Sequence, residues 1–192
     1  TTNTSAIPLY NLESALKKPN RFAALHSHLY SNLYDVAEGS QTDPTVIDRL
    51  KSYVHSLGGY PVMVRRGEIG YCYNIMIGGL FSAAIVLAVD FDIDPQEIDH
   101  AWMIRADYGV GPFGMMDAVG LNVIHDSASD VADGDLFQKK MRARKEHLFQ
   151  PFILADTLGM KSGKGFYGYP HPSYLAPEFL THKVSCSEAY IG

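Results

Sequence analysis

Two histidines follow a short apolar run, and this position makes them candidates for acid–base chemistry. His26 and His28 end the segment RFAALHSH at residues 21–28. The apolar run predicts a buried strand, and catalytic groups collect at the carboxyl ends of strands in open α/β sheets. Imidazole titrates near neutral pH, so a histidine there can take and return a proton. A purely structural histidine at a strand end is the alternative.

The sequence motifs of several other enzyme classes are missing. No HExxH occurs, which argues against a zinc peptidase, and no metal site is predicted. The segment GMKSGKG at 159–165 has the wrong interval for a phosphate-binding loop, and the chain contains no GxGxxG dinucleotide fingerprint. The remaining histidines have no Cys, His or Glu partner at a metal-ligand spacing and are assigned no role: His55, His100, His125, His147, His171 and His182.

Strand and helix patterns alternate over the first 65 residues. The strand at 22–26 and the run YPVMV at 60–64 flank a helix that begins at Asp43-Pro44 and ends at Gly58-Gly59. This alternation is typical of a parallel sheet with helical crossovers. Two or three strands do not form a stable sheet by themselves. The sheet is therefore incomplete, or strands from another part of the protein complete it. Beyond about residue 67 only helical patterns follow.

The composition predicts a packed globular protein. Of 192 residues, 46% are hydrophobic and 19% charged, and the net charge of −5 provides no positive field for nucleic acid. Cys72 and Cys186 show no disulfide or zinc-finger spacing. We therefore expect no nucleic-acid partner and a reducing, cytoplasmic location.

Residues 69–89 form a run without any charged side chain. By length alone such a run can cross a bilayer, which leaves a single-span membrane protein as one hypothesis. Asn74, Ser82, the Gly78-Gly79 pair and the lack of a second such run argue against it. We expect instead no membrane partner and a helix buried on all sides, at a subunit interface.

Taken together, the motifs resemble the C-terminal two-thirds of the NAD-dependent 3-hydroxyacyl-CoA dehydrogenases. The resemblance covers roughly residues 3 to 180, and the two motifs GPFxxxDxxGL and SGxGFYxYP in that order make it specific. The segments that carry it are NTS at 3–5, RFAALH at 21–26, TDPTVIDRLKSYVHSLGGYPV at 42–62, GYCYN at 70–74, DIDPQEIDHAWMI at 92–104, GVGPFGMMDAVGL at 109–121 and KSGKGFYGYP at 161–170.

The resemblance implies a fold and a domain division. Residues 1–67 would be the C-terminal portion of an NAD-binding Rossmann domain whose Gly-rich half is absent from these residues. Residues 68–192 would be an all-α substrate and dimerisation domain, similar to the C-terminal domain of 6-phosphogluconate dehydrogenase. We therefore expect the chain to be a C-terminal piece of a longer dehydrogenase, inactive by itself, with NAD held mainly by the missing part.

The resemblance also implies roles for four residues. His26 looks like the general base that takes the proton of the substrate 3-hydroxyl, and Asp35 stands where the family has a glutamate that orients this histidine. Ser5 and Asn74 match positions that hydrogen-bond the reacting oxygen. The chain departs from the family in a loop after His26 that is about three residues shorter, in Asp for Glu at position 35, and in Ile75 where an arginine is common.

Partners follow from the same resemblance. An acyl-CoA is the expected substrate, and the helix at 70–90 is expected to form a homodimer interface. The alternative is a non-catalytic dimerisation or acyl-CoA-binding module derived from the family. The chain length of the acyl group is not indicated.

Overall fold

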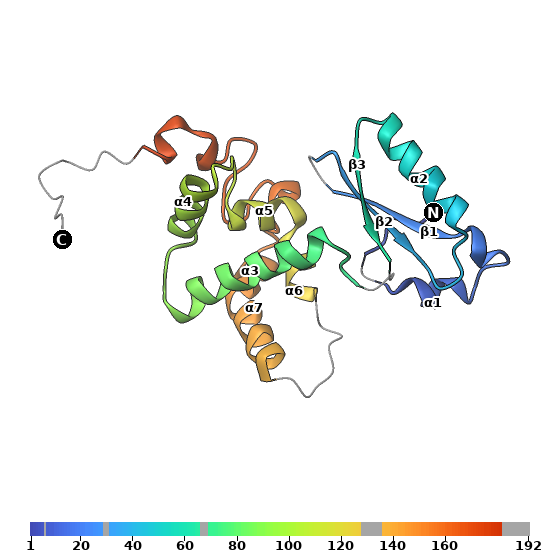
Figure 1. The fold of residues 1–192 in the computed structure, drawn as a ribbon. Coiled ribbons are helices and arrows are strands. Elements are labelled where there is room, and N and C mark those ends of the chain that lie inside the picture. Colours follow the sequence, from blue (N-terminus) through green and yellow to red (C-terminus); the bar gives the residue numbers. More distant parts are fainter. Residues whose placement is uncertain (6, 29–30, 66–68, 128–135, 182–192) are drawn as a thin grey trace, which may run out of the picture. The chain divides into compact units, whose positions relative to one another are not determined.

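The computed structural model describes residues 1–5, 7–28, 31–65, 69–127 and 136–181 (Figure 1). The chain divides into two compact units, residues 1–79 and residues 80–192. The division falls inside helix α3, Tyr73–Asp90, which the sequence analysis assigns whole to the second domain. Cys186 and His182 lie outside the described residues.

The first unit contains a three-stranded sheet in the order β1-β2-β3. Its strands are β1 (Ala23–Ser27), β2 (Leu33–Glu38) and β3 (Tyr60–Val64). The strands at β1 and β3 are confirmed, whereas β2 was not predicted. β2 pairs with β3 in parallel but with β1 antiparallel, so the expectation of an all-parallel sheet is wrong. The short link from β1 to β2 permits only a hairpin, because a parallel crossover needs about a dozen residues or more.

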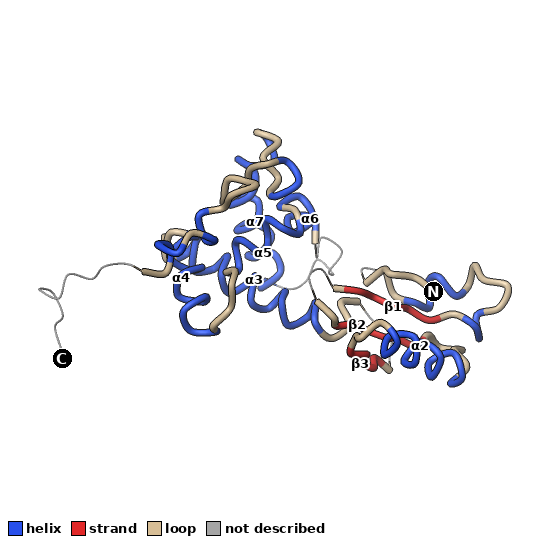
Figure 2. Tube along the Cα trace, turned by 90° about the horizontal axis from the view of Figure 1, so that it is seen from above, coloured by secondary structure: helices blue, strands red, loops and turns tan. Residues whose placement is uncertain are grey.

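Helices cover both faces of this sheet. α2 (Pro44–Ser56) begins at Asp43, whose carboxylate accepts a hydrogen bond from the Thr45 amide at 2.8 Å, with Pro44 in the first turn. Its buried Ile47 and Val54 pack against β1 and β2, and Figure 2 shows α2 alongside the sheet. The short helix α1 (Leu9–Glu13) supplies a separate cluster.

The alternation of side chains along β1 decides which face carries the candidate histidines. Ala23 belongs to the cluster with α2, and Ala24 belongs to the cluster with Leu9 of α1 and Tyr71. Side chains two residues apart in a strand share a face. His26 and His28 therefore lie on the face of Ala24, away from α2.

The second unit is helical. It contains most of α3, followed by α4 (Pro95–Ala106), α5 (Pro112–Val119), α6 (Leu121–Asp126) and α7 (Leu136–Leu154). Short 3₁₀ turns at Met160–Ser162, Ser173–Leu175 and Pro177–Phe179 follow. The predicted helix start at 94–97 is confirmed: Asp94 accepts a hydrogen bond from the Gln96 amide at 2.7 Å.

Two buried carboxylates accept hydrogen bonds from the glycine-rich motifs of this unit. Asp117 accepts hydrogen bonds from the amides of Phe166 and Tyr167 and from the Tyr169 hydroxyl, each at 3.0 Å. A Cβ on Gly165 would lie 2.1 Å from the carboxylate, so only glycine lets the loop approach this closely. Burial raises the pKa of Asp117.

Asp99 has the corresponding role at the start of α5. It accepts hydrogen bonds from the amides of Phe113 and Gly114 at 2.8 and 3.0 Å, and from the Tyr167 hydroxyl at 2.8 Å. It thus binds two free amides at a helix N-terminus. Burial raises its pKa too. The GPFxxxD and SGxGFYxY motifs therefore assemble the helical unit.

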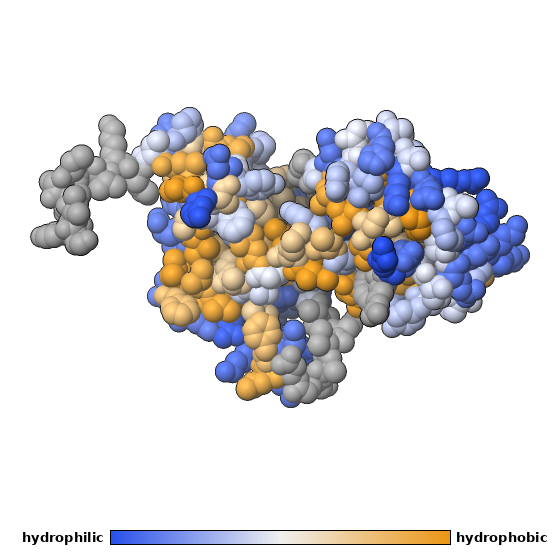
Figure 3. All heavy atoms as spheres, viewed as in Figure 1, coloured by the Kyte–Doolittle hydropathy of each residue, from blue (hydrophilic) through white to orange (hydrophobic). Residues whose placement is uncertain are grey.

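Helix α3 is largely exposed within the single chain, so the burial on all sides that the sequence predicts would need a second copy. Only 17% of its residues are buried within the chain, and by length and composition it could span a membrane. Figure 3 shows apolar side chains gathered along this part of the surface. An exposed row at intervals of four residues follows the helix: Ile75, Gly79, Ala83 and Leu87. So large an apolar face calls for a covering surface.

Candidate active site

The N-terminal segment runs beside β1 and brings Asn3 to the histidines. The Thr2 amide donates to the Ala23 carbonyl at 3.3 Å, and the Leu25 amide donates to the Thr2 carbonyl at 2.9 Å. The side-chain oxygen of Asn3 accepts a hydrogen bond from the Ser27 amide at 2.9 Å. These bonds extend the edge of the sheet and fix the Asn3 backbone next to His26.

The hydrogen bond to Asn3 determines the tautomer of the His26 ring. His26 Nδ1 lies 2.6 Å from the Asn3 carbonyl oxygen. A carbonyl can only accept, so Nδ1 carries the hydrogen and Nε2 of the neutral ring keeps a free lone pair. That lone pair is the group a general base requires.

Asn74 and Ser5 lie next to this unprotonated nitrogen. Nδ2 of Asn74, in the first turn of α3, is 3.4 Å from His26 Nε2 and donates a hydrogen bond to Ser5 Oγ at 2.9 Å. The Gly70 amide holds the Ser5 carbonyl at 2.8 Å. The structure thus brings three of the four predicted site residues together, from segments far apart in the sequence.

Asp35, the fourth, is placed differently from the expectation. The family resemblance implies that it orients His26, but its Oδ2 lies 2.9 Å from Nε2 of His28 instead. Asp35 and His28 are both buried. The antiparallel register sets Asp35 opposite His26 across the strands, and a side chain there also reaches the diagonal position 28. The orienting partner of His26 is the Asn3 carbonyl.

Sequence reasoning missed Asn3, Tyr71 and the pairing of His28. Asn3 binds His26 through its backbone carbonyl, and the type of side chain at a position does not predict such a backbone contact. Tyr71, in the segment GYCYN, donates to the Thr4 carbonyl at 2.8 Å and its ring packs 5.9 Å from His26. The HSH spacing did place both imidazoles on one face of a strand, and this was the available signal for His28.

The arrangement suits proton transfer at a neutral alcohol or carbonyl. A free imidazole nitrogen faces an amide and a hydroxyl, both uncharged hydrogen-bonding groups. Among the described residues, no cluster of three His, Cys, Asp or Glu side chains could hold a metal ion.

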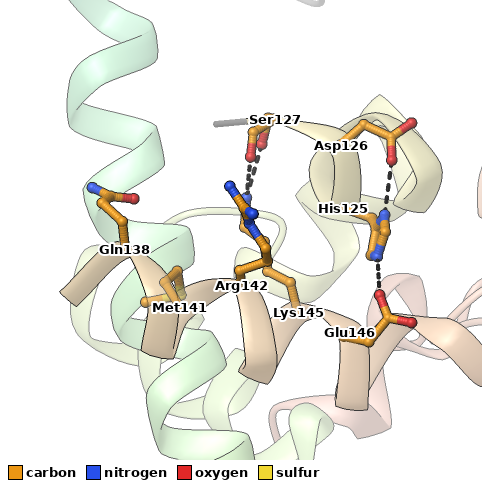
Figure 4. Close-up of a pocket in the computed structure, with 8 residues that line it drawn as sticks. All are labelled: His125, Asp126, Ser127, Gln138, Met141, Arg142, Lys145 and Glu146. Carbon is orange, nitrogen blue, oxygen red and sulfur yellow. Dashed lines mark hydrogen bonds and ion pairs between the residues drawn. The ribbon is translucent and has the colours of Figure 1, made fainter. Parts of the chain in front are cut away.

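A small pocket of about 190 Å³ in the helical unit involves His125, a histidine to which the sequence analysis gave no role (Figure 4). Its Nδ1 lies 2.8 Å from Asp126 and its Nε2 lies 2.7 Å from Glu146, so it links α6 to α7. Hydrogen bonds to Asp126 and then to Glu146 raise the pKa of His125. Lys145 lies beside it and donates to the Ile124 and Ser127 carbonyls at 2.8 and 2.7 Å.

The His125→Gln variant should therefore lose stability mainly in mild acid. Because the folded state raises the pKa of His125 above its unfolded value near 6.5, its contribution is full below that pH and fades as the pH rises through the folded pKa. Urea unfolding at pH 5.5 and pH 8.5 should show the larger loss of unfolding free energy at pH 5.5. An equal loss at both values would contradict the charge-dependent link.

Comparison with known proteins identifies the family. Residues 70–169 match the family model described as 3-hydroxyacyl-CoA dehydrogenase, C-terminal domain, and residues 1–67 match the one described as 3-hydroxyacyl-CoA dehydrogenase, NAD binding domain. The chain belongs to the 3-hydroxyacyl-CoA dehydrogenase family. The family resemblance and the combination of sheet unit and helical unit expected from the sequence are confirmed.

Curated relatives of this dehydrogenase family extend well beyond the chain. It is 28% identical over 181 residues to a 5-formyl-3-hydroxy-2-methylpyridine 4-carboxylate 5-dehydrogenase of Mesorhizobium japonicum, covering 88% of the chain and 55% of the relative. It is 29% identical to a fatty acid oxidation complex subunit alpha of Pseudomonas aeruginosa, covering 98% of the chain and 26% of the relative. The chain thus spans about half or less of these relatives.

Solved structures of the family share the fold. A diketoreductase matches with a TM-score of 0.72 and 29% identity, covering 88% of this chain and 58% of that one. An (S)-3-hydroxybutyryl-CoA dehydrogenase from Ralstonia eutropha matches with a TM-score of 0.69 and 22% identity, covering 88% of this chain and 59% of that one.

Proposed function

We propose that this chain supplies the proton-transferring half of an NAD-dependent 3-hydroxyacyl-CoA dehydrogenase, which interconverts 3-hydroxyacyl-CoA and 3-oxoacyl-CoA. The observation that carries the proposal is the placement of the His26 ring: the Asn3 carbonyl holds its Nδ1, and its unprotonated Nε2 faces Asn74 beside Ser5. The family supports the substrate class and the cofactor.

Each residue of the site has a definable task in this reaction. His26 Nε2 takes the proton of the substrate 3-hydroxyl, or returns it in the reverse direction. Asn74 and Ser5 hydrogen-bond the reacting oxygen without adding charge. When His26 becomes an imidazolium, its Nδ1–H bond to the Asn3 carbonyl strengthens and stabilises the charge.

The residues present fit one end of an NAD site. The base and its neutral neighbours suit the end at which the redox chemistry takes place, but the 192 residues contain no GxGxxG turn for the pyrophosphate. NAD, when bound, supplies the hydride acceptor. The pyrophosphate contacts would come from a part of the enzyme outside these residues.

Absorbance at 340 nm tests the proposal directly. The protein as its gene encodes it is mixed with acetoacetyl-CoA and NADH. In parallel reactions, NADPH replaces NADH, or free acetoacetate replaces acetoacetyl-CoA. We expect oxidation of NADH that requires the CoA thioester. Binding of acetoacetyl-CoA, detected by calorimetry, without any turnover would contradict the dehydrogenase and favour the non-catalytic acyl-CoA-binding module.

We also propose that the exposed apolar row of α3 is covered by a second copy of the chain, forming a homodimer. A helix with 17% of its residues buried exposes more apolar surface than a monomer usually tolerates. Glycine and alanine within the row let another helix approach closely, and a symmetric pair would cover both copies at once. A lipid bilayer is the competing cover.

Replacing Ala83 with glutamate should break this dimer. A carboxylate in the middle of the row would be buried unpaired, so we expect dimerisation to weaken by about a hundredfold or more. Analytical ultracentrifugation without detergent measures this, with Ala101→Glu on the exposed side of α4 as the matched control. A monomeric parent protein would contradict the dimer, and a parent that requires detergent would indicate a membrane.

The proposed location is the cytoplasm. Cys72 is an exposed free thiol, which a reducing compartment keeps from oxidation. Cell fractionation followed by immunoblotting checks this, and recovery in an oxidising compartment would contradict it.

A further inference from the structure

Two imidazoles share the face of the sheet that carries the buried carboxylate of Asp35. The register pairs Asp35 with His26, and His28, directly after the last residue of β1, lies on the same face two residues further on. The carboxylate nevertheless contacts His28 and leaves His26 to the Asn3 carbonyl. His26 is the base of the proposed function. If His28 decides which group accepts the His26 hydrogen, it therefore affects the reaction.

His28 is held more tightly than His26. Its side chain is 5% exposed, and because a carboxylate oxygen accepts, its Nε2 carries a hydrogen towards Asp35 Oδ2 at 2.9 Å. The ring also packs edge-on against two others, with its centroid 4.7 Å from Tyr73 and 4.8 Å from His26 at 83° to the His26 ring. The His28 ring therefore packs against one side of His26, the proposed base.

Asp35 still has capacity to accept another hydrogen bond. Its Oδ1 is buried and has no hydrogen-bond partner within the part of the chain that the structure describes. A buried carboxylate without enough donors is costly, and it attracts any ring hydrogen within reach. His26, directly opposite, carries such a hydrogen on Nδ1.

We propose that His28 is a positioning residue of the active site. By binding Asp35 Oδ2 and packing edge-on against the His26 ring, it keeps the His26 hydrogen on the Asn3 carbonyl, and so keeps Nε2 of His26 turned towards Asn74 and Ser5. The proposal rests on the proposed function for its catalytic consequence, but the ring geometry it describes exists without substrate or NAD.

Ring-nitrogen NMR measures this geometry in the resting protein. In long-range ¹⁵N–¹H spectra, protonated and bare imidazole nitrogens have well-separated shifts. We expect Nδ1–H with bare Nε2 at position 26, and a hydrogen on Nε2 at position 28. A His26 ring with its hydrogen on Nε2 would overturn the proposal before any variant is made.

Two substitutions then separate positioning from simple packing. His28→Phe keeps a ring but removes the donor to Asp35, so the His26 Nδ1–H should turn from the Asn3 carbonyl to the carboxylate, which changes the His26 ¹H and ¹⁵N shifts. His28→Gln keeps an N–H that can reach the carboxylate, so the His26 Nδ1–H should stay on the Asn3 carbonyl and its shifts should persist. His55→Gln, on the exposed side of α2, is the control. Unchanged His26 shifts in folded His28→Phe protein would overturn the proposal. If that variant fails to fold, the tautomers of the parent and of His28→Gln decide: a His26 ring changed in His28→Gln would overturn it.

The catalytic consequence is measured separately. If the enzyme reduces acetoacetyl-CoA, His28→Phe should lower kcat about tenfold with little change in KM, whereas His28→Gln stays within a few-fold of the parent. Equal kcat values for His28→Phe and the parent would overturn the positioning role while leaving the proposed function intact. A protein that shows the expected tautomers but no turnover supports the positioning and contradicts the proposed function.

Discussion

The His26→Gln variant is expected to lose about a thousandfold in kcat for the reduction of acetoacetyl-CoA, with little change in KM. Glutamine is similar in size and can still donate to the Asn3 carbonyl, but it has no nitrogen that takes a proton near neutral pH. General acid–base catalysis contributes about a hundredfold to ten-thousandfold to a rate. The loss should therefore fall within this range.

The assay at 340 nm measures the effect, with a control at another histidine. His55→Gln makes the same exchange on an exposed part of α2 and should leave kcat unchanged. Circular dichroism and the melting temperature show whether the His26→Gln protein remains folded. Full activity in a folded His26→Gln enzyme would remove His26 from the proposed catalytic role.

Asp117→Ala should produce the largest loss of stability, roughly 3 to 5 kcal/mol of unfolding free energy. The substitution leaves the amides of Phe166 and Tyr167 and the Tyr169 hydroxyl without their acceptor. Alanine cannot replace it, and the side chain of Asp117 is almost fully buried, so water does not readily enter. The chain should unfold at a markedly lower urea concentration.

A matched control makes this result specific. Glu178→Ala removes an exposed carboxylate from the same unit and should change the unfolding free energy by less than about 0.5 kcal/mol. Urea unfolding followed by tyrosine and tryptophan fluorescence compares the variants. A loss at Asp117 no larger than that at Glu178 would mean that the motif is not held together by this carboxylate.

Several elements of the fold could be predicted from local sequence. The helix start at Asp94 and the α2 start at Asp43 follow from capping chemistry that involves neighbouring residues only. The strand at 22–26 follows from a short apolar run. β2 was missed because LYDVAEG contains a buried aspartate in place of regular apolar alternation. Once β2 is recognised as a strand, its direction relative to β1 follows from the short link, whereas its parallel pairing with β3 depends on a contact across α2.

The site shows the same division. The motifs indicated His26, Ser5 and Asn74, and the tertiary structure brings them within hydrogen-bonding distance. The partner of Asp35 could not be predicted, because an aspartate opposite one histidine and diagonal to another can bind either. That choice depends on ring packing and on the Asn3 carbonyl.

The sequence by itself determined the family and the two kinds of unit and indicated His26 as the candidate base, because side-chain type and spacing are local properties. Only the tertiary structure decided that the sheet is mixed, that α3 is exposed and that Asp35 binds His28. These features depend on contacts between distant segments. Local preferences allow more than one arrangement of such segments, and the arrangements differ in which polar groups are buried without a partner.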